Sequence, residues 1–316
     1  MVSKKKFTFK RILAVIITVI LVFSIVSMVA TKIIYDNIFS RYDCELTELP
    51  DELDALVSSR EERLFLSGEN TLSGYLYRSQ NNNPHSALVV IAPGFNACAD
   101  NYLWQIKSLL DYGWSVFSFN TTGSCSSEGD SAIGFPQEIN DVTASLKYIE
   151  NNNRFGYNDI VLLGHSRGGY AACCVVNSEF DIAAVVSISG INSAMEGVIG
   201  SSTEYVGSLA YGNYGFLWLY QAMLFGTKTL NLNAAEELSK TDTPTLIVHG
   251  ENDSKVPMDK FSIISHKEKI SSDSVEYLVC SSPQNSGHTD LLFDEDLTAN
   301  DYLMEQINQF LETNVK

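Results

Sequence analysis

The chain has 316 residues, of which 45% are hydrophobic and 19% are charged, and its formal net charge is −17. This composition is typical of a globular protein and excludes collagen-like, low-complexity and disordered chains. The excess of acidic residues also argues against nucleic acid as a partner, because a negatively charged surface repels phosphate.

A membrane-spanning segment is predicted near the N-terminus. The residues from Ile12 to Ala30 carry no charge, and as a helix they span about 28 Å, close to the hydrocarbon thickness of a bilayer. Residues 1–32 hold six basic and no acidic residues, so residues 33–316 carry a net charge of −23 (15 basic against 38 acidic). Because positive charges flank the cytoplasmic side of a span, the N-terminus is expected in the cytoplasm and the rest of the chain outside.

These features divide the chain into four parts. We predict a cytoplasmic basic tail at 1–11, a transmembrane signal anchor at 12–31, a linker or approach segment at 32–60 and one domain at 61–316. The alternative is a signal peptide whose cleavage would release a secreted protein, but the apolar stretch is longer than such peptides usually have. We expect the acidic domain to be repelled by anionic headgroups and to stand off its anchor.

Strands and helices alternate along the domain. This alternation predicts an α/β fold with a mostly parallel sheet and helices on both faces. The pattern has a gap between two strands at about 191–240. The predicted strands are 62–67, 71–78, 87–92, 114–119, 160–163, 182–188, 245–248 and 275–279; the helices lie near 100–112, 137–151, from 167 onward, 257–268 and 298–312.

A nucleophilic serine is predicted at the end of the strand 160–163, in Gly164-His165-Ser166-Arg167-Gly168. The G-x-S-x-G pattern between a strand and a helix forms a tight turn that exposes the serine hydroxyl. The start of the following helix favours negative charge developing at Ser166. We therefore predict Ser166 as a nucleophile.

A serine nucleophile needs a base and a carboxylate that orients the base. Of the five histidines, His288 is the predicted base because it lies in a loop between the last strand and the last helix. Asp253 follows the strand 245–248 and is the predicted acid, with Glu251 and Asp290 as alternatives. The other four histidines are assigned to other environments: His85 to a polar loop, His165 to a position pointing away from the serine hydroxyl, His249 to a packed strand end and His266 to a charged helix face.

The oxyanion of an acyl-transfer reaction needs hydrogen-bond donors. We predict the backbone N–H groups of Phe95 and Arg167. No His, Cys or Asp cluster has the spacing of metal ligands, so no metal is expected. Among the six cysteines, Cys98 and Cys125 are a candidate disulfide pair, and Cys173 and Cys174 are expected to be free and buried.

With these motifs, residues 61–316 resemble the α/β-hydrolase family, and within it membrane-anchored bacterial hydrolases similar to the serine aminopeptidase-like group. The resemblance is carried by Gly164–Gly168, His249–Asp253 with Val256-Pro257, and Gly287-His288. It implies an eight-stranded sheet, a cap formed by the insertion at about 191–240, a Ser166–Asp253–His288 triad and no cofactor. The chain departs from many relatives at Pro93-Gly94, where they have His-Gly, and at 120–127, where they have Asp-x-Arg-Gly-x-Gly-x-Ser.

The sequence thus predicts a serine hydrolase that cleaves a small carboxylic ester with an apolar acyl part. Three cap aromatics, Tyr211, Tyr214 and Trp218, are candidate substrate-binding residues. Glu196 and Glu204 keep an aminopeptidase or amidase open, because a free amino terminus needs an acidic partner. A membrane-tethered binding module without turnover is the alternative from another class.

Overall fold

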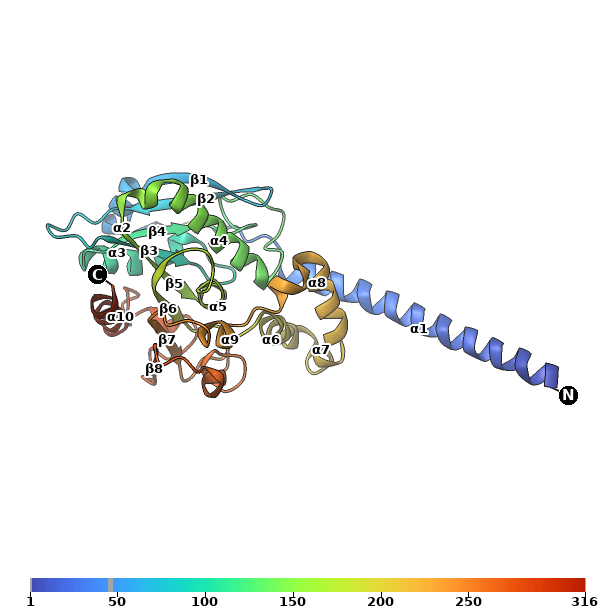
Figure 1. The fold of residues 1–316 in the computed structure, drawn as a ribbon. Helices are drawn as coiled ribbons and strands as arrows, with labels where there is room; N and C mark the ends of the chain where they lie inside the picture. Colours follow the sequence, from blue (N-terminus) through green and yellow to red (C-terminus); the bar gives the residue numbers. More distant parts are fainter. Residues whose placement is uncertain (1, 45–47, 316) are drawn as a thin grey trace.

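The structure is a computed structural model that describes residues 2–44 and 48–315. One sheet with the strand order β1-β2-β4-β3-β5-β6-β7-β8 runs through the domain (Figure 1). β1 and β2 pair antiparallel, β2 pairs antiparallel with β4, and the strands from β4 to β8 are parallel. The strands are β1 (Glu61–Ser67), β2 (Asn70–Tyr77), β3 (Ala87–Ala92), β4 (Ser115–Phe119), β5 (Asp159–His165), β6 (Ile182–Ile188), β7 (Thr245–Gly250) and β8 (Val275–Cys280).

All eight predicted strands are present, and the predicted α/β class with a mostly parallel sheet is confirmed. The central strand β3 consists of apolar residues that are buried on both faces, as expected where helices cover a parallel sheet on both sides. Two separate apolar clusters pack on the two faces of the sheet. The helices of the domain are α2 (Asp51–Ser59), α3 (Leu103–Asp111), α4 (Phe135–Asn151), α5 (Arg167–Cys174), α6 (Ala194–Val206), α7 (Leu209–Gly212), α8 (Tyr214–Leu230), α9 (Ala234–Leu238) and α10 (Asp301–Asn314).

The N-terminal helix α1 (Val2–Ile38) continues beyond the apolar stretch and enters the domain (Figure 1). Its part from Thr8 to Ile38 is long and apolar enough to cross a membrane. The sequence predicts a linker at 32–60, but Tyr35, Ile38 and Phe39 are almost completely buried in the larger core cluster. Apolar side chains three to four residues apart give this end of the helix a core-facing side. α1 is therefore attached to the domain by packing as well as by the chain.

The predicted helix at 257–268 is wrong. Turns occupy its first half, and a short 3-10 helix (Ile264–Lys269) follows. Residues 261–263 instead pair with the segment after β6: Asn192 N–H donates to the carbonyl of Phe261, and Ile263 N–H donates to that of Gly190. These long-range backbone bonds replace the local ones that a helix needs.

The candidate disulfide between Cys98 and Cys125 is also wrong, because Cys125 is bonded to Cys44. Tyr42 N–H donates to Gly123, and Cys125 N–H donates to Tyr42, so the segment after α1 lies alongside 123–125. This pairing brings Cys44 to Cys125. Cys98 and Cys280 are free and buried, as are Cys173 and Cys174, for which the prediction is confirmed.

Candidate functional site

Ser166 lies in a sharp turn between β5 and α5. Its backbone has φ 56° and ψ −114°, a conformation that is strained for a residue with a side chain. The turn is held by the Ser166 N–H, which donates to the carbonyl of Ile188 at 2.8 Å. Gly164 and Gly168 are needed for close packing, because a Cβ atom at either would collide with neighbouring backbone. The glycine pattern in the sequence therefore produces the exposed hydroxyl geometry expected of such a turn.

The structure brings Ser166, His288 and Asp253 together at the carboxyl-terminal ends of β5, β8 and β7. His288 Nε2 lies 2.9 Å from Ser166 Oγ, and His288 Nδ1 lies 2.7 Å from Asp253 Oδ2. A carboxylate can only accept, so Nδ1 carries the proton and Nε2 is free to accept the serine proton. The three side chains form one continuous chain of hydrogen bonds.

Asp253 is buried and held in the ionised form. Burial alone would raise the pKa of its carboxyl, but hydrogen bonds from His249 and His288 lower the pKa well below its ordinary value. The backbone N–H groups of Lys255 and Val256 donate to the other carboxylate oxygen at 2.9 and 2.8 Å. The carboxylate thus keeps its negative charge beside His288. His249, predicted as a packed strand-end residue, has this additional contact with Asp253 at 3.4 Å.

His165 connects the two sides of the site, a role that the sequence analysis missed. Its Nε2–H donates to the carbonyl of His288 at 3.0 Å, so Nδ1 must accept from the Tyr102 hydroxyl at 3.0 Å. The same hydroxyl accepts from the Gly94 N–H at 2.8 Å. Burial lowers the pKa of His165 to about 3, so the ring stays neutral. The Gly94 loop is thereby linked to the backbone of His288.

Beneath Ser166, the Arg167 side chain is buried against α4. Its guanidinium lies 2.8 Å from Glu138 and donates to the Thr121 hydroxyl at 2.9 Å. Burial raises the pKa of Glu138 to about 8, and the neighbouring Arg167 opposes this rise. The guanidinium also lies 5.6 Å from the ring of Phe95. The two residues predicted as oxyanion donors are therefore in contact through their side chains.

The backbone N–H groups of Phe95 and Arg167 have no hydrogen-bond acceptor among residues 2–44 and 48–315. Arg167 is the first residue of α5, where N–H groups lack partners within the helix. Phe95 lies in the loop after β3 and lines the same pocket as Ser166. Both donors remain available to a bound group.

Two hollows flank Ser166 and His288. The larger, of about 330 Å³, is lined by polar as well as apolar side chains, and Glu196, Glu204 and Lys255 are among the polar ones. Its apolar wall is formed by Ile38, Phe95, Phe135, Ile191, Val256 and Phe261. The smaller, of about 210 Å³, lies on the side of the Gly94 loop and reaches Leu292 and Phe293. Ile38 comes from the end of α1, within the stretch that the sequence predicts to be a linker.

The structure does not bring Tyr211, Tyr214 and Trp218 to Ser166. They lie on α7 and α8, where Tyr211 and Tyr214 are exposed, and neither hollow beside Ser166 includes them. The reason is that the end of α1 lies against α8, and Ile38 and α6 form the pocket wall instead.

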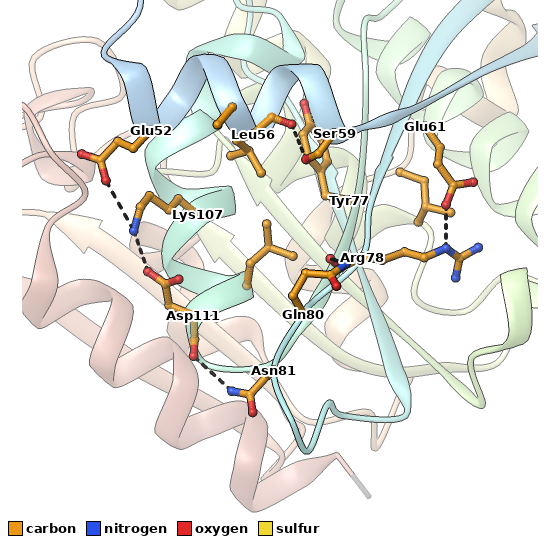
Figure 2. A pocket seen from close by; sticks show the side chains of 13 residues that line it. Glu52, Leu56, Ser59, Glu61, Tyr77, Arg78, Gln80, Asn81, Lys107 and Asp111 are labelled. Atoms are coloured by element: carbon orange, nitrogen blue, oxygen red, sulfur yellow. Dashed lines mark hydrogen bonds and ion pairs between the residues drawn. The ribbon is translucent and has the colours of Figure 1, made fainter.

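A larger hollow, of about 650 Å³, lies between α2, α3 and β2 (Figure 2). Its charged side chains pair with one another: Lys107 contacts Glu52 and Asp111, and Arg78 contacts Glu61. In sheets of this kind, ligands bind at the carboxyl ends of the parallel strands. This hollow lies at the opposite end of the sheet. We therefore assign the candidate site to the hollows beside Ser166.

One group of three potential metal ligands occurs within the described ranges, namely the sulfur atoms of Cys44, Cys98 and Cys125, within 4.8 Å of one another. Two of them are joined in the disulfide, which leaves a single thiol. This group does not fit a metal centre.

Comparisons with known proteins agree with this architecture. The model of a family described as having the alpha/beta hydrolase fold matches residues 87–200. A search of curated proteins gave no match. An esterase from Pyrococcus furiosus has a similar structure, with 17% identity and a TM-score of 0.66 over 88% of this chain and 100% of the esterase.

Two further solved structures are similar. Est1E from Butyrivibrio proteoclasticus with bound ferulic acid has 17% identity and a TM-score of 0.60, over 80% of this chain and 99% of Est1E. An acylaminoacyl peptidase from Pyrococcus horikoshii has 15% identity and a TM-score of 0.57, over 85% of this chain and 44% of the peptidase. The resemblance noted in the sequence is confirmed at the level of the fold: the chain has the α/β-hydrolase fold.

Proposed function

We propose that this chain, with its α/β-hydrolase fold, is a serine hydrolase that cleaves a carboxylic ester. The observation that carries the proposal is the continuous hydrogen-bonded chain from Ser166 through His288 to Asp253. An alcohol nucleophile, a neutral imidazole and a buried carboxylate in this geometry are the parts that acyl transfer requires.

In the first half of the reaction, His288 Nε2 takes the hydroxyl proton as Ser166 Oγ attacks the ester carbonyl carbon. The carbonyl oxygen becomes an oxyanion and accepts from the N–H groups of Phe95 and Arg167. As the tetrahedral intermediate collapses, the bond to the alkoxide breaks and His288 returns the proton to the leaving alcohol. Asp253 stabilises the imidazolium that forms in between.

In the second half, water replaces the alcohol. His288 removes a proton from the water as its oxygen attacks the acyl-enzyme carbonyl. The bond to Ser166 Oγ then breaks, the serine regains its proton from His288 and the carboxylic acid leaves. The residues act without a metal or cofactor in this scheme.

An ester with an apolar acyl group fits the pocket. The two hollows that adjoin Ser166 give separate room for the acyl and alcohol parts, and large apolar side chains such as Phe95, Phe135 and Phe261 line part of the larger one. The Pyrococcus furiosus protein is an esterase, which supports the same chemistry for this fold. We assign the acyl part to the larger hollow.

An aminopeptidase or amidase is the second candidate, because Glu196 and Glu204 line the larger hollow. Both carboxylates already have partners: Glu196 lies 2.7 Å from His266 and Glu204 lies 3.1 Å from Lys255. An incoming ammonium group must compete with these partners, so we favour an ester.

α1 supports a membrane location for the enzyme. We propose that it is a retained anchor, with the N-terminus in the cytoplasm and the domain outside the cell membrane.

The test compares p-nitrophenyl esters of increasing acyl length with aminoacyl p-nitroanilides, for the full chain and for Ser166→Ala. We expect ester hydrolysis that exceeds anilide hydrolysis and disappears in the variant. Faster anilide hydrolysis would favour the peptidase. Absence of both activities in the folded wild type would favour a binding module and contradict the proposal.

A further inference from the structure

α7 and α8 present an exposed apolar surface beside α1. Residues 205–227 include no Asp, Glu, Lys or Arg. Several large side chains of this stretch point outward, with exposed fractions between 43% and 77%. We call this set the α7–α8 surface: Leu209, Tyr211, Tyr214, Leu219, Met223 and Leu224. Exposed large apolar side chains gathered on two neighbouring helices of an otherwise acidic chain indicate an interaction site.

The surface adjoins the apolar part of α1 and not only its end. Figure 1 shows α1 leaving the domain beside α6, α7 and α8. The ring of Phe216 in α8 lies 6.2 Å from the ring of Phe23 in α1. Asn213, between α7 and α8, donates to the Thr31 hydroxyl at 2.6 Å. α8 therefore contacts the stretch Ile12–Ala30 at Phe23, and the residue before α8 contacts Thr31 just beyond that stretch.

These contacts determine how deep α8 would lie in a bilayer that α1 crosses. If the hydrocarbon region begins after Arg11, Phe23 lies about 17 Å along the helix from Ile12, near the middle of a bilayer about 30 Å thick. Thr31 then lies at the outer boundary of the hydrocarbon. The first turn of α8, which contacts Phe23, is thus placed at the level of the outer leaflet.

The first charged side chains after the apolar stretch lie just beyond Thr31, at the outer boundary of the hydrocarbon in this placement. Lys32 pairs with Asp36, and the Tyr220 hydroxyl donates to Asp36 at 3.1 Å. Tyr and Trp side chains, which prefer the boundary between lipid and water, occur at Tyr211, Tyr214 and Trp218 on the same helices. The acidic charge of the chain lies elsewhere than on the α7–α8 surface.

We propose that the α7–α8 surface is embedded in the outer leaflet of the lipid bilayer that α1 crosses, and that α1, α7 and α8 form one membrane-inserted unit. The proposal rests on α1 being a membrane helix and is independent of the proposed hydrolysis. It replaces the expectation that the acidic domain stands off its anchor. Ile38 lies about 9 Å beyond Lys32 along the helix, so the pocket that it lines opens close to the bilayer.

The test uses the full chain in phosphatidylcholine vesicles with single cysteine variants carrying an environment-sensitive fluorophore. The native free thiols are buried and do not compete for the label. Leu209→Cys and Met223→Cys report on the α7–α8 surface, and Val22→Cys reports on α1. Asn82→Cys is the control, in the exposed loop between β2 and β3. Quenching by a lipid with a nitroxide on its acyl chain is compared with quenching by aqueous iodide.

We expect labels at 209, 223 and 22 to be quenched severalfold more by the lipid nitroxide than the label at 82, and the reverse order with iodide. If labels at 209 and 223 behave like the control while the label at 22 is quenched by lipid, α1 is inserted alone and the proposal is wrong. If the label at 22 also behaves like the control, the membrane insertion itself is wrong. Neither readout depends on catalysis, so a failure here is distinct from a failure of the proposed function.

Discussion

Ile38, the last residue of the apolar N-terminal helix, lines the same pocket as Ser166. A helix long enough to cross a membrane therefore also forms part of the wall of the candidate site. This relationship links the location of the protein to its chemistry, because the position of α1 determines the shape of the pocket.

The packing of α1 on the domain is tested by two isoleucines of the same helix. Ile38 is 5% exposed, whereas Ile33 is 57% exposed. We expect Ile38→Ala to lower the free energy of unfolding by about 2–4 kcal/mol, because it leaves a cavity in the core. Ile33→Ala is the matched control and is expected to change stability little. Thermal unfolding in detergent measures both; equal effects would contradict the assigned packing.

Asp253 is predicted to orient His288. In Asp253→Asn the amide does not hold the imidazole in the required tautomer, so we expect kcat for a p-nitrophenyl ester to fall by about 10⁴-fold. Glu251→Gln, at an exposed neighbouring position that the sequence left as an alternative, serves as the control. Near wild-type rates in Asp253→Asn, or a large loss of kcat in Glu251→Gln, would mean that a residue other than Asp253 orients His288.

Tyr102 is predicted to position the Gly94 loop through its hydroxyl, which bridges the Gly94 N–H and His165. Tyr102→Phe removes the bridge but keeps the ring. We expect kcat to fall about tenfold, equivalent to about 1.4 kcal/mol in the barrier, with KM nearly unchanged. If the variant only unfolds at a lower temperature and keeps its kcat, the hydroxyl has a structural role alone.

His165 predicts a pH dependence of stability. In the unfolded chain a histidine binds a proton below about pH 6.5, whereas burial holds the pKa of His165 in the folded chain at about 3. Between these values the unfolded state binds more protons, so stability decreases as pH falls.

The measurement is the melting temperature of the wild type and of His165→Gln from pH 7 to pH 4. We expect a shallower decrease for the variant, because its unfolded state lacks this proton. The comparison concerns slopes, so a uniformly lower melting temperature of the variant does not affect it. Parallel curves would contradict the buried neutral histidine.

The strands and the serine turn were predictable because their signals are local. β3 is a run of apolar residues between polar loops, and the glycines around Ser166 allow the close backbone approach that the sharp turn requires. His288 and Asp253 were found by elimination and by their positions after strands. The strands and the serine turn needed only neighbouring residues, whereas His288 and Asp253 also needed the order of strands along the chain.

Other features depend on contacts between distant segments. The polar and acidic character of residues 33–60 suggested a linker, whereas Tyr35 and Ile38 at the end of α1 are buried. The buried residues at three- to four-residue spacing were the signal that the sequence analysis overlooked.

The position of His165 next to Ser166 suggested a side chain pointing away from the serine hydroxyl. Its link to His288 joins residues 123 positions apart in the chain. The wrong prediction of a helix at 257–268 has a similar cause, since the backbone of residues 261–263 pairs with residues 190–192. Long-range pairing of this kind leaves no local pattern in the sequence.

The central claim is that Ser166 is a nucleophile activated by His288. The most direct measurement is the intact mass of the full chain after incubation with a fluorophosphonate, followed by peptide mapping of the adduct. We predict one adduct per chain, located on Ser166 and absent from both Ser166→Ala and His288→Gln. A folded wild-type protein that forms no adduct, or one that carries it on another residue, would contradict the account.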